Sequence, residues 1–227
     1  MAKTRNPYII VEGMRYERIP LKTRILTQND DMLDIIREYA LPQMQPGDII
    51  SICESPLAIT QGRAVPVSEL KIGLLARIMW RFVAKVPYGI GLRAPASMQC
   101  AIDECGAGRI ILAAAIGGLG KLVGRKGDFY RIAGMQAALI DAAGTSPVPP
   151  YHQTVIKGPL HPEKEAQRIS DSIGFPVAVM DINDIGGCWM IGGSRDLAKQ
   201  FMEKVMKDNP QGQSDELTPV CLIRRAG

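Results

Sequence analysis

The segment 98–134, MQCAIDECGAGRIILAAAIGGLGKLVGRKGDFYRIAG, combines three kinds of residue that could do chemistry. Asp103 and Glu104 form a carboxylate pair, glycines recur through the segment, and basic side chains follow. Adjacent carboxylates can hold a hard divalent cation. Glycine amides, together with lysine and arginine, can hold phosphate. The combination predicts a site for a metal ion and a nucleotide.

The acidic pair lies in IDECGAG, residues 102–108, after an apolar stretch and before small residues. Mg²⁺ and Mn²⁺ take carboxylate oxygens together with the phosphates of a substrate. Asp103 and Glu104 are therefore candidate metal ligands and candidate catalytic residues. The alternative is an acidic turn whose carboxylates only accept hydrogen bonds from backbone amides.

The stretch GGLGKLVGRKGD, residues 117–128, is predicted to be a loop in which backbone amides can approach an anion. It is not a Walker A loop, because Leu122 follows Lys121 where that motif has Ser or Thr, and it is not GxGxxG. Asp128 is a further candidate metal ligand. A flexible, solvated basic loop is the alternative reading. The candidate nucleotide-binding residues are Lys121, Gly124, Arg125, Lys126, Gly127 and Arg131.

A third acidic segment is MDINDIGG, residues 180–187, which follows the apolar strand pattern FPVAV. Carboxylates at the carboxyl end of a strand, before a glycine turn, commonly face a ligand. Asp181 is therefore a fourth candidate metal ligand. An Asx-type turn between two strands is the equally simple alternative.

Composition narrows the class of protein. The 227 residues carry a formal net charge of +4, which suits an anionic small ligand but is too weak to argue for DNA. Aromatic residues make up 5%, which disfavours binding of single-stranded nucleic acid by base stacking. The 5 cysteines show no CxxC spacing and are expected to be free thiols in a reducing cytoplasm. We expect no signal peptide, no membrane partner and no nucleic-acid partner.

The predicted elements favour an α+β fold with mixed or antiparallel sheets and flanking helices. Helices are expected after a cap at Asn29 or Asp30, from Val67 to about Val83, over 135–143, over 162–173 with Pro162 in the first turn, and after the cap Ser194. The proline-rich SPVPPY, residues 146–151, predicts a lobe 1–146 with the metal and nucleotide segment and a smaller lobe 147–227, whose last strand returns to the main body. The predicted strands are 8–11, 16–21, 49–53, 57–63, 99–103, 109–115, 128–133, 153–157, 176–182, 187–191 and 219–223. The three alanines at 113–115 would also suit a helix.

The chain resembles the coenzyme F-420:γ-glutamyl ligase family nearly from end to end. RIPLKTRILTQNDDMLDII at 18–36 looks like the family's first strand, nucleotide-contacting loop and first helix. PGDIISICESPLAITQGR at 46–63 and GRKGDFYRIAG at 124–134 look like two further family blocks. QCAIDECGAGR at 99–109 falls where the family has a metal-binding aspartate, which maps to Asp103.

The resemblance implies joining of glutamate to a phosphorylated, carboxylate-bearing small molecule while GTP, or ATP in a divergent branch, is consumed. It also implies a divalent metal, magnesium or manganese, and an intertwined α+β homodimer. Three departures stand out: Ile59 and Thr60 lie where the family has a lysine, Gly124 and Arg125 replace its Asp-Thr pair, and Gly106 lies near a lost asparagine. A non-catalytic binder of a nucleotide or phosphorylated metabolite is therefore the alternative function.

Overall fold

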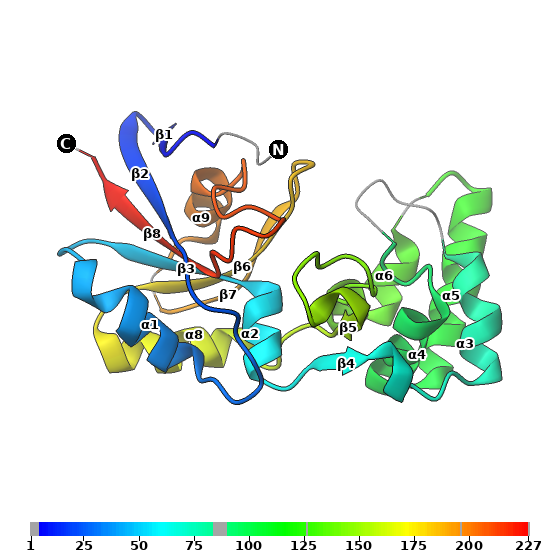
Figure 1. Cartoon of the computed structure of the whole chain (residues 1–227). Coiled ribbons are helices and arrows are strands. Elements are labelled where there is room, and N and C mark those ends of the chain that lie inside the picture. Colours follow the sequence, from blue (N-terminus) through cyan, green and yellow to red (C-terminus); the bar gives the residue numbers. More distant parts are fainter. Residues whose placement is uncertain (1–4, 84–89, 126, 196, 227) are drawn as a thin grey trace. The chain divides into compact units, whose positions relative to one another are not determined.

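The computed structural model describes residues 5–83, 90–125, 127–195 and 197–226. The chain forms two compact units: unit 1 comprises residues 1–62 and 159–227, and unit 2 comprises residues 63–158. Figure 1 shows both, with unit 1 carrying the main sheet. Unit 2 is thus an insertion between two segments of unit 1, which differs from the predicted division after residue 146.

Unit 1 contains a six-stranded mixed sheet in the order β1-β2-β8-β3-β6-β7. The pairing of β3 with β6 is parallel, and the other neighbours are antiparallel. As predicted, the last strand, β8, returns to the main sheet, where it lies between β2 and β3. The strands are β1 (Tyr8–Val11), β2 (Met14–Leu21), β3 (Ile49–Cys53), β6 (Val177–Ile182), β7 (Cys188–Gly193) and β8 (Val220–Arg225).

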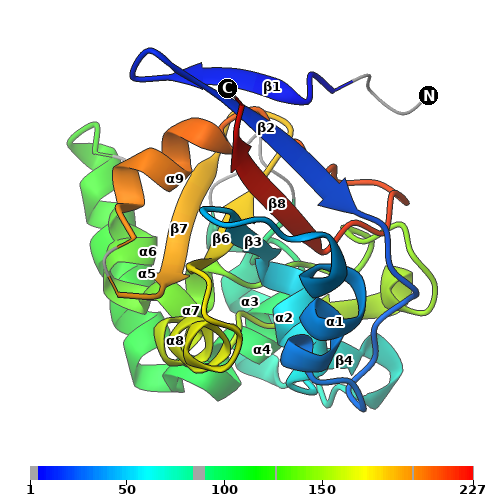
Figure 2. The same ribbon diagram turned by 90° about the vertical axis from the view of Figure 1, so that its left-hand side faces the viewer.

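Helices cover both faces of this sheet (Figures 1 and 2). Helix α9 (Lys199–Val205) packs Met202 and Val205 against one face, where Ala178 and Met180 of β6 are buried. Helices α1 (Met32–Tyr39) and α8 (Pro162–Ile173) lie against the other face, and α2 (Glu54–Thr60) follows β3. Strand alternation explains the two layers, because successive side chains of β6 point to opposite faces.

Unit 2 is mainly helical. Its two short strands, β4 (Ala64–Pro66) and β5 (Thr154–Ile156), form an antiparallel pair. Its core buries Met98, Ala101, Ile110, Ala113 and Val155. The helices are η2 (Val67–Glu69), α3 (Leu74–Met79), η3 (Trp80–Phe82), α4 (Pro95–Cys105), α5 (Ala107–Leu122), α6 (Asp128–Ala133), α7 (Met135–Ala138) and η4 (Tyr151–Gln153), and unit 1 adds the short η1 (Leu41–Gln43).

The mixed α+β class predicted from the sequence is confirmed, but four predicted strands are wrong. Residues 57–63 lie mostly in α2, 99–103 in α4, 109–115 in α5 and 128–133 in α6. The predicted glycine-rich loop is helical as far as Leu122. Alanine is the strongest helix former, and the alanines of α4 and α5 outweigh their β-branched neighbours.

Two predicted helix starts are also corrected. The N-cap of α1 is Asp31, whose Oδ1 accepts a hydrogen bond from the backbone N–H of Leu33 at 2.7 Å, rather than Asn29 or Asp30. The N-cap of α9 is Ala198. Ser194 instead uses its Oγ to accept from the backbone N–H of Val177, so it fastens the end of β7 to the start of β6.

Within the described residues, no single helix is long and apolar enough to cross a membrane. Helices α4 and α5, which meet at an angle of 115°, reach that length and composition only as a bent pair.

Candidate functional site

The acidic pair lies in the last turn of helix α4 in unit 2, not at the end of a strand. Consecutive helical residues point about 100° apart, so the two carboxylates do not face the same way. Asp103 is exposed, and the amide Nε2 of Gln99, one turn earlier, donates to its Oδ1 at 2.7 Å. An exposed carboxylate with this one neighbour keeps accepting capacity for a cation.

Glu104 is held by two cations. Arg63 Nη2 lies 2.7 Å from its Oε2, and Lys157 Nζ lies 2.8 Å from its Oε1. Arg63 Nη2 also donates to Gln136 Oε1 at 3.2 Å, and its Nε donates to the carbonyl of Gly158. Because Arg63 and Gly158 are the first and last residues of unit 2, this cluster ties the two ends of the unit together.

The electrostatics of Glu104 follow from these contacts. Burial raises the pKa of the carboxyl, but hydrogen bonds from Lys157 and Arg63 outweigh burial and hold the pKa below its usual range. Glu104 is therefore ionised and neutralised by its neighbours at neutral pH. To bind a metal ion it would have to release these partners, so its observed arrangement is that of a structural ion pair.

The basic stretch surrounds a buried carboxylate. Asp128, in the first turn of α6, accepts hydrogen bonds on Oδ1 from Arg125 Nη2 and Arg131 Nη1, each at 3.1 Å. The Arg125 and Arg131 side chains are 63% and 68% exposed, so their charges also reach solvent. Lys121 lies in the last turn of α5, where its Nζ is 3.5 Å from the carbonyl of Phe82. Lys126 lies outside the described residues.

Two glycines of the stretch 117–128, which the sequence predicted to approach phosphate, instead allow close packing of two helices. A Cβ on Gly120 would lie 2.4 Å from Asp128 Oδ2, and one on Gly117 would lie 3.0 Å from Phe129 Cβ. Helices α5 and α6 therefore approach closely because α5 lacks side chains at these positions. Gly124 and Gly127 lie after the helix with φ of +76° and +84°, a conformation that favours glycine.

Asp181 belongs to unit 1, near the end of β6, opposite Trp189 of β7. The other three predicted metal ligands, Asp103, Glu104 and Asp128, belong to unit 2. Across the described parts of the chain, no group of three or more His, Cys, Asp or Glu side chains is placed to hold a metal ion. A cation at Asp103 would thus need oxygens from a bound nucleotide, an arrangement that Mg²⁺ commonly uses.

A family model described as F420-0:Gamma-glutamyl ligase matches residues 20–198, which include all of unit 2. The chain belongs to this family. No curated protein matches the chain. Membership indicates a ligase-type activity, and γ-glutamyl ligases of this family in general use GTP and a divalent metal.

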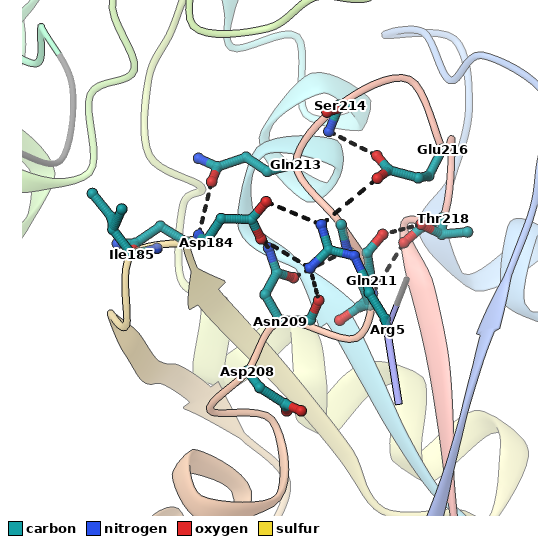
Figure 3. Close-up of polar contacts among 12 residues, drawn as sticks. Arg5, Asp184, Ile185, Asp208, Asn209, Gln211, Gln213, Ser214, Glu216 and Thr218 are labelled. Atoms are coloured by element: carbon teal, nitrogen blue, oxygen red, sulfur yellow. Dashed lines mark hydrogen bonds and ion pairs between the residues drawn. The ribbon is translucent and has the colours of Figure 1, made fainter. Parts of the chain in front are cut away.

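The γ-glutamyl ligase match ends before α9 and β8, and a polar cluster of unit 1 lies across that limit (Figure 3). Arg5 donates two hydrogen bonds to Asp184, from Nη1 to Oδ1 at 2.9 Å and from Nη2 to Oδ2 at 3.0 Å. Asn209 Nδ2 donates to the same Oδ1 at 2.8 Å, and Glu216 lies 3.7 Å from the guanidinium. Only Asp184 falls inside the family match.

Sequence reasoning missed this cluster. The segment DNPQGQSDE, residues 208–216, looks like a solvated loop, yet Asn209 and Gln211 are almost fully buried. Gln211 Oε1 accepts from Ser51 Oγ at 3.1 Å, which ties the loop to β3. Ser51 and Gln211 are 160 positions apart in the sequence, and Arg5 and Asp184 are 179 positions apart. No local sequence pattern therefore indicates either contact.

Proposed function

We propose that this protein is a nucleotide- and divalent-metal-dependent ligase that joins a carboxylate to an amine, with γ-glutamyl-type chemistry. The observation that carries the proposal is the family match over residues 20–198. GTP or ATP would be the co-substrate, and the carboxylate substrate would be a small, phosphorylated molecule. The proposal keeps the cytoplasmic location expected from the sequence.

The chemistry proceeds in two displacements. The carboxylate oxygen attacks the γ-phosphorus of the nucleotide, forming an acyl phosphate and releasing the nucleoside diphosphate. The amine nitrogen then attacks the acyl carbon, the C–O bond to phosphate breaks, and the amine loses a proton as the amide forms. Cationic groups lower both barriers by stabilising the charge that develops on phosphate oxygens. A divalent metal, when bound, supplies further charge of the same sign.

The residues proposed for these roles are those that stay exposed. Asp103 is the candidate metal ligand because its carboxylate is open to solvent. Arg125 and Arg131 are the candidate phosphate-binding residues, since each touches Asp128 while exposing most of its side chain. Glu104 has the weaker case, because both of its oxygens contact cations.

A matched pair of variants tests Asp103. Asp171 of α8 repeats its setting in unit 1: it is exposed, helical, and accepts a hydrogen bond from Gln167 Nε2 four residues earlier, at 2.6 Å. We expect Asp103→Asn to abolish amine-dependent GTP or ATP hydrolysis and to weaken Mn²⁺ binding in the presence of nucleotide, measured by calorimetry. Asp171→Asn should change neither. Equal behaviour of the two variants would reject Asp103 as the ligand.

The proposed role of Arg125 in phosphate binding can also be tested with a matched control variant. Arg125→Ala should weaken GTP binding about ten- to a hundredfold, because a charge-assisted hydrogen bond contributes about 1.5–3 kcal/mol. Arg37 of α1 forms a comparable exposed pair with Asp34, three residues away, so Arg37→Ala should leave affinity unchanged. Nucleotide binding without amine-dependent hydrolysis would favour the non-catalytic binder, the second candidate function.

The related ligases also suggest assembly, and we propose a homodimer. The two-stranded β4–β5 sheet of unit 2 is small for an independent sheet and would gain from additional strands. Light scattering should give twice the 24.7 kDa chain mass. A monomeric mass at micromolar concentrations contradicts the dimer without affecting the ligase proposal.

A further inference from the structure

Helix α5 leaves a row of large apolar side chains in water. Ile111, Leu112 and Leu119 are about half to two-thirds exposed, and Leu122 and Val123 at its end are 83% and 73% exposed. The opposite side of α5, with Ile110 and Ala113, is fully buried in the core of unit 2. A helix that is apolar on its core side and again on its outer side differs from an ordinary surface helix, which turns polar residues outward.

A second row lies on the neighbouring α3 and η3, where Leu74, Ile78 and Phe82 are 75%, 43% and 67% exposed. The two elements are adjacent: Lys121 Nζ of α5 lies 3.5 Å from the carbonyl of Phe82, and Figure 1 shows α3 beside α5. We name these two rows the α3–α5 face. It comprises Leu74, Ile78, Phe82, Ile111, Leu112, Leu119, Leu122 and Val123.

Charge distinguishes this face from an ordinary protein interface. Residues 63–158 contain 12 Lys or Arg and 5 Asp or Glu, a net charge of +7, whereas the rest of the chain contains 15 and 18, a net charge of −3. No acidic residue occurs in 70–82 or 105–125. Arg77, Arg81, Lys121 and Arg125 are exposed on the segments that form the face.

We propose that the α3–α5 face docks on the surface of an anionic lipid bilayer. Exposed apolar side chains gain free energy by entering the boundary between headgroups and acyl chains, and arginine and lysine beside them, without acidic residues, are attracted to anionic lipids. The apolar rows enter the boundary between headgroups and acyl chains, while the basic side chains meet lipid phosphates. A second copy of the chain fits less well, since it would bring two basic faces together. The proposal revises the expectation that this chain has no membrane partner.

Sedimentation of the full chain with vesicles tests the proposal. We expect binding to phosphatidylcholine vesicles that contain 30% phosphatidylglycerol and at least tenfold weaker binding to pure phosphatidylcholine. Raising the salt concentration from 0.05 M to 0.5 M should weaken binding about tenfold, because salt screens attraction to the lipid surface. Equal binding to both vesicle types, or none to either, overturns the proposal.

Matched variants assign the binding to this face. The double variant Leu119→Ser, Leu122→Ser should lower vesicle affinity at least tenfold, whereas Ile10→Ser, which removes a 73% exposed side chain from unit 1, should not. Arg77→Gln should cost about fivefold, since each basic residue near an anionic surface contributes a factor of that size. Arg195→Gln, an exposed arginine of unit 1, is its control.

Analytical ultracentrifugation of the same variants tests whether a second copy of the chain, rather than a lipid bilayer, covers the α3–α5 face. If Leu119→Ser, Leu122→Ser converts a dimer to a monomer and leaves vesicle binding unchanged, the face is an interface between copies and the lipid proposal is wrong. If the variant loses vesicle binding at an unchanged oligomeric state, the proposal is supported.

Discussion

Unit 1 and unit 2 differ in how completely they bury their apolar side chains. Unit 1 sandwiches its sheet between helices, so strands such as β8 have both faces covered, with Val220, Cys221 and Leu222 all fully buried. Unit 2 buries one side of its helices and leaves the apolar α3–α5 face in water. The charges divide in the same way, with the basic excess confined to unit 2. Unit 1 thus resembles a self-sufficient scaffold, whereas unit 2 leaves an exposed apolar face, on which the lipid proposal rests.

The largest expected difference between the units comes from the same substitution, leucine to alanine, made once in each unit. Leu222→Ala in β8 should lower the free energy of unfolding by about 2–5 kcal/mol, because it removes a fully buried side chain and leaves a cavity. Leu122→Ala in α5, at 83% exposure, should change it by less than about 0.5 kcal/mol. Urea denaturation measures both. A comparable loss at Leu122 would mean that the α3–α5 face is covered in the protein alone.

The next test concerns the glycines of α5. Gly120→Ala should destabilise unit 2 by about 1–3 kcal/mol, because its Cβ would meet the carboxylate of Asp128 at 2.4 Å. Gly118 has open space around its Cβ position, so Gly118→Ala should stabilise the helix by about 0.5–1 kcal/mol. Thermal unfolding separates the pair. Two neutral substitutions would restore the reading of this stretch as a flexible loop.

The third test, with a smaller expected effect than Leu222→Ala or Gly120→Ala, concerns Glu104. Glu104→Gln should lower stability at pH 7 by about 1–2 kcal/mol, since Arg63 and Lys157 lose a charged partner. The folded pKa of Glu104 is depressed, so its contribution is present above the unfolded pKa and disappears as pH falls through the folded pKa. The gap between wild type and variant should therefore begin to close as pH falls below about 4.3, the ordinary pKa of a glutamate, and should vanish once pH is below the depressed folded pKa. A gap that stays constant as Glu104 becomes protonated would contradict the ion-pair role.

The two units also differ in how far sequence reasoning succeeds. In unit 1, α8 begins at Pro162 as predicted, and β3 and β6 appear as apolar runs bounded by turns. In unit 2, α4 and α5 are apolar on more than one side, so they lack the periodicity that separates a helix from a strand. Glycine, usually a helix breaker, lies inside α5 because α6 needs the space.

The candidate site shows the same limit. The sequence identifies Asp103 and Asp128 as acidic residues among glycines and basic residues, and both lie within the range 20–198 that the family model matches. It does not reveal that Glu104 has partners 41 and 53 positions away, or that Arg5 reaches Asp184. Such pairs depend on the tertiary fold, and local spacing carries no signal for them.

The place of β8 in the sheet has a consequence for synthesis on the ribosome. Strands β1 and β2 share no hydrogen-bonded edge with β3, β6 and β7 except through β8, whose residues, 220–225, are made last of all the strands. Until then the nascent sheet consists of a hairpin and a three-stranded fragment, each with an open edge prone to aggregation. Unit 2 is complete by residue 158 and can fold during this wait. The main sheet of unit 1 can therefore be completed only after unit 2 and strand β8 have been made.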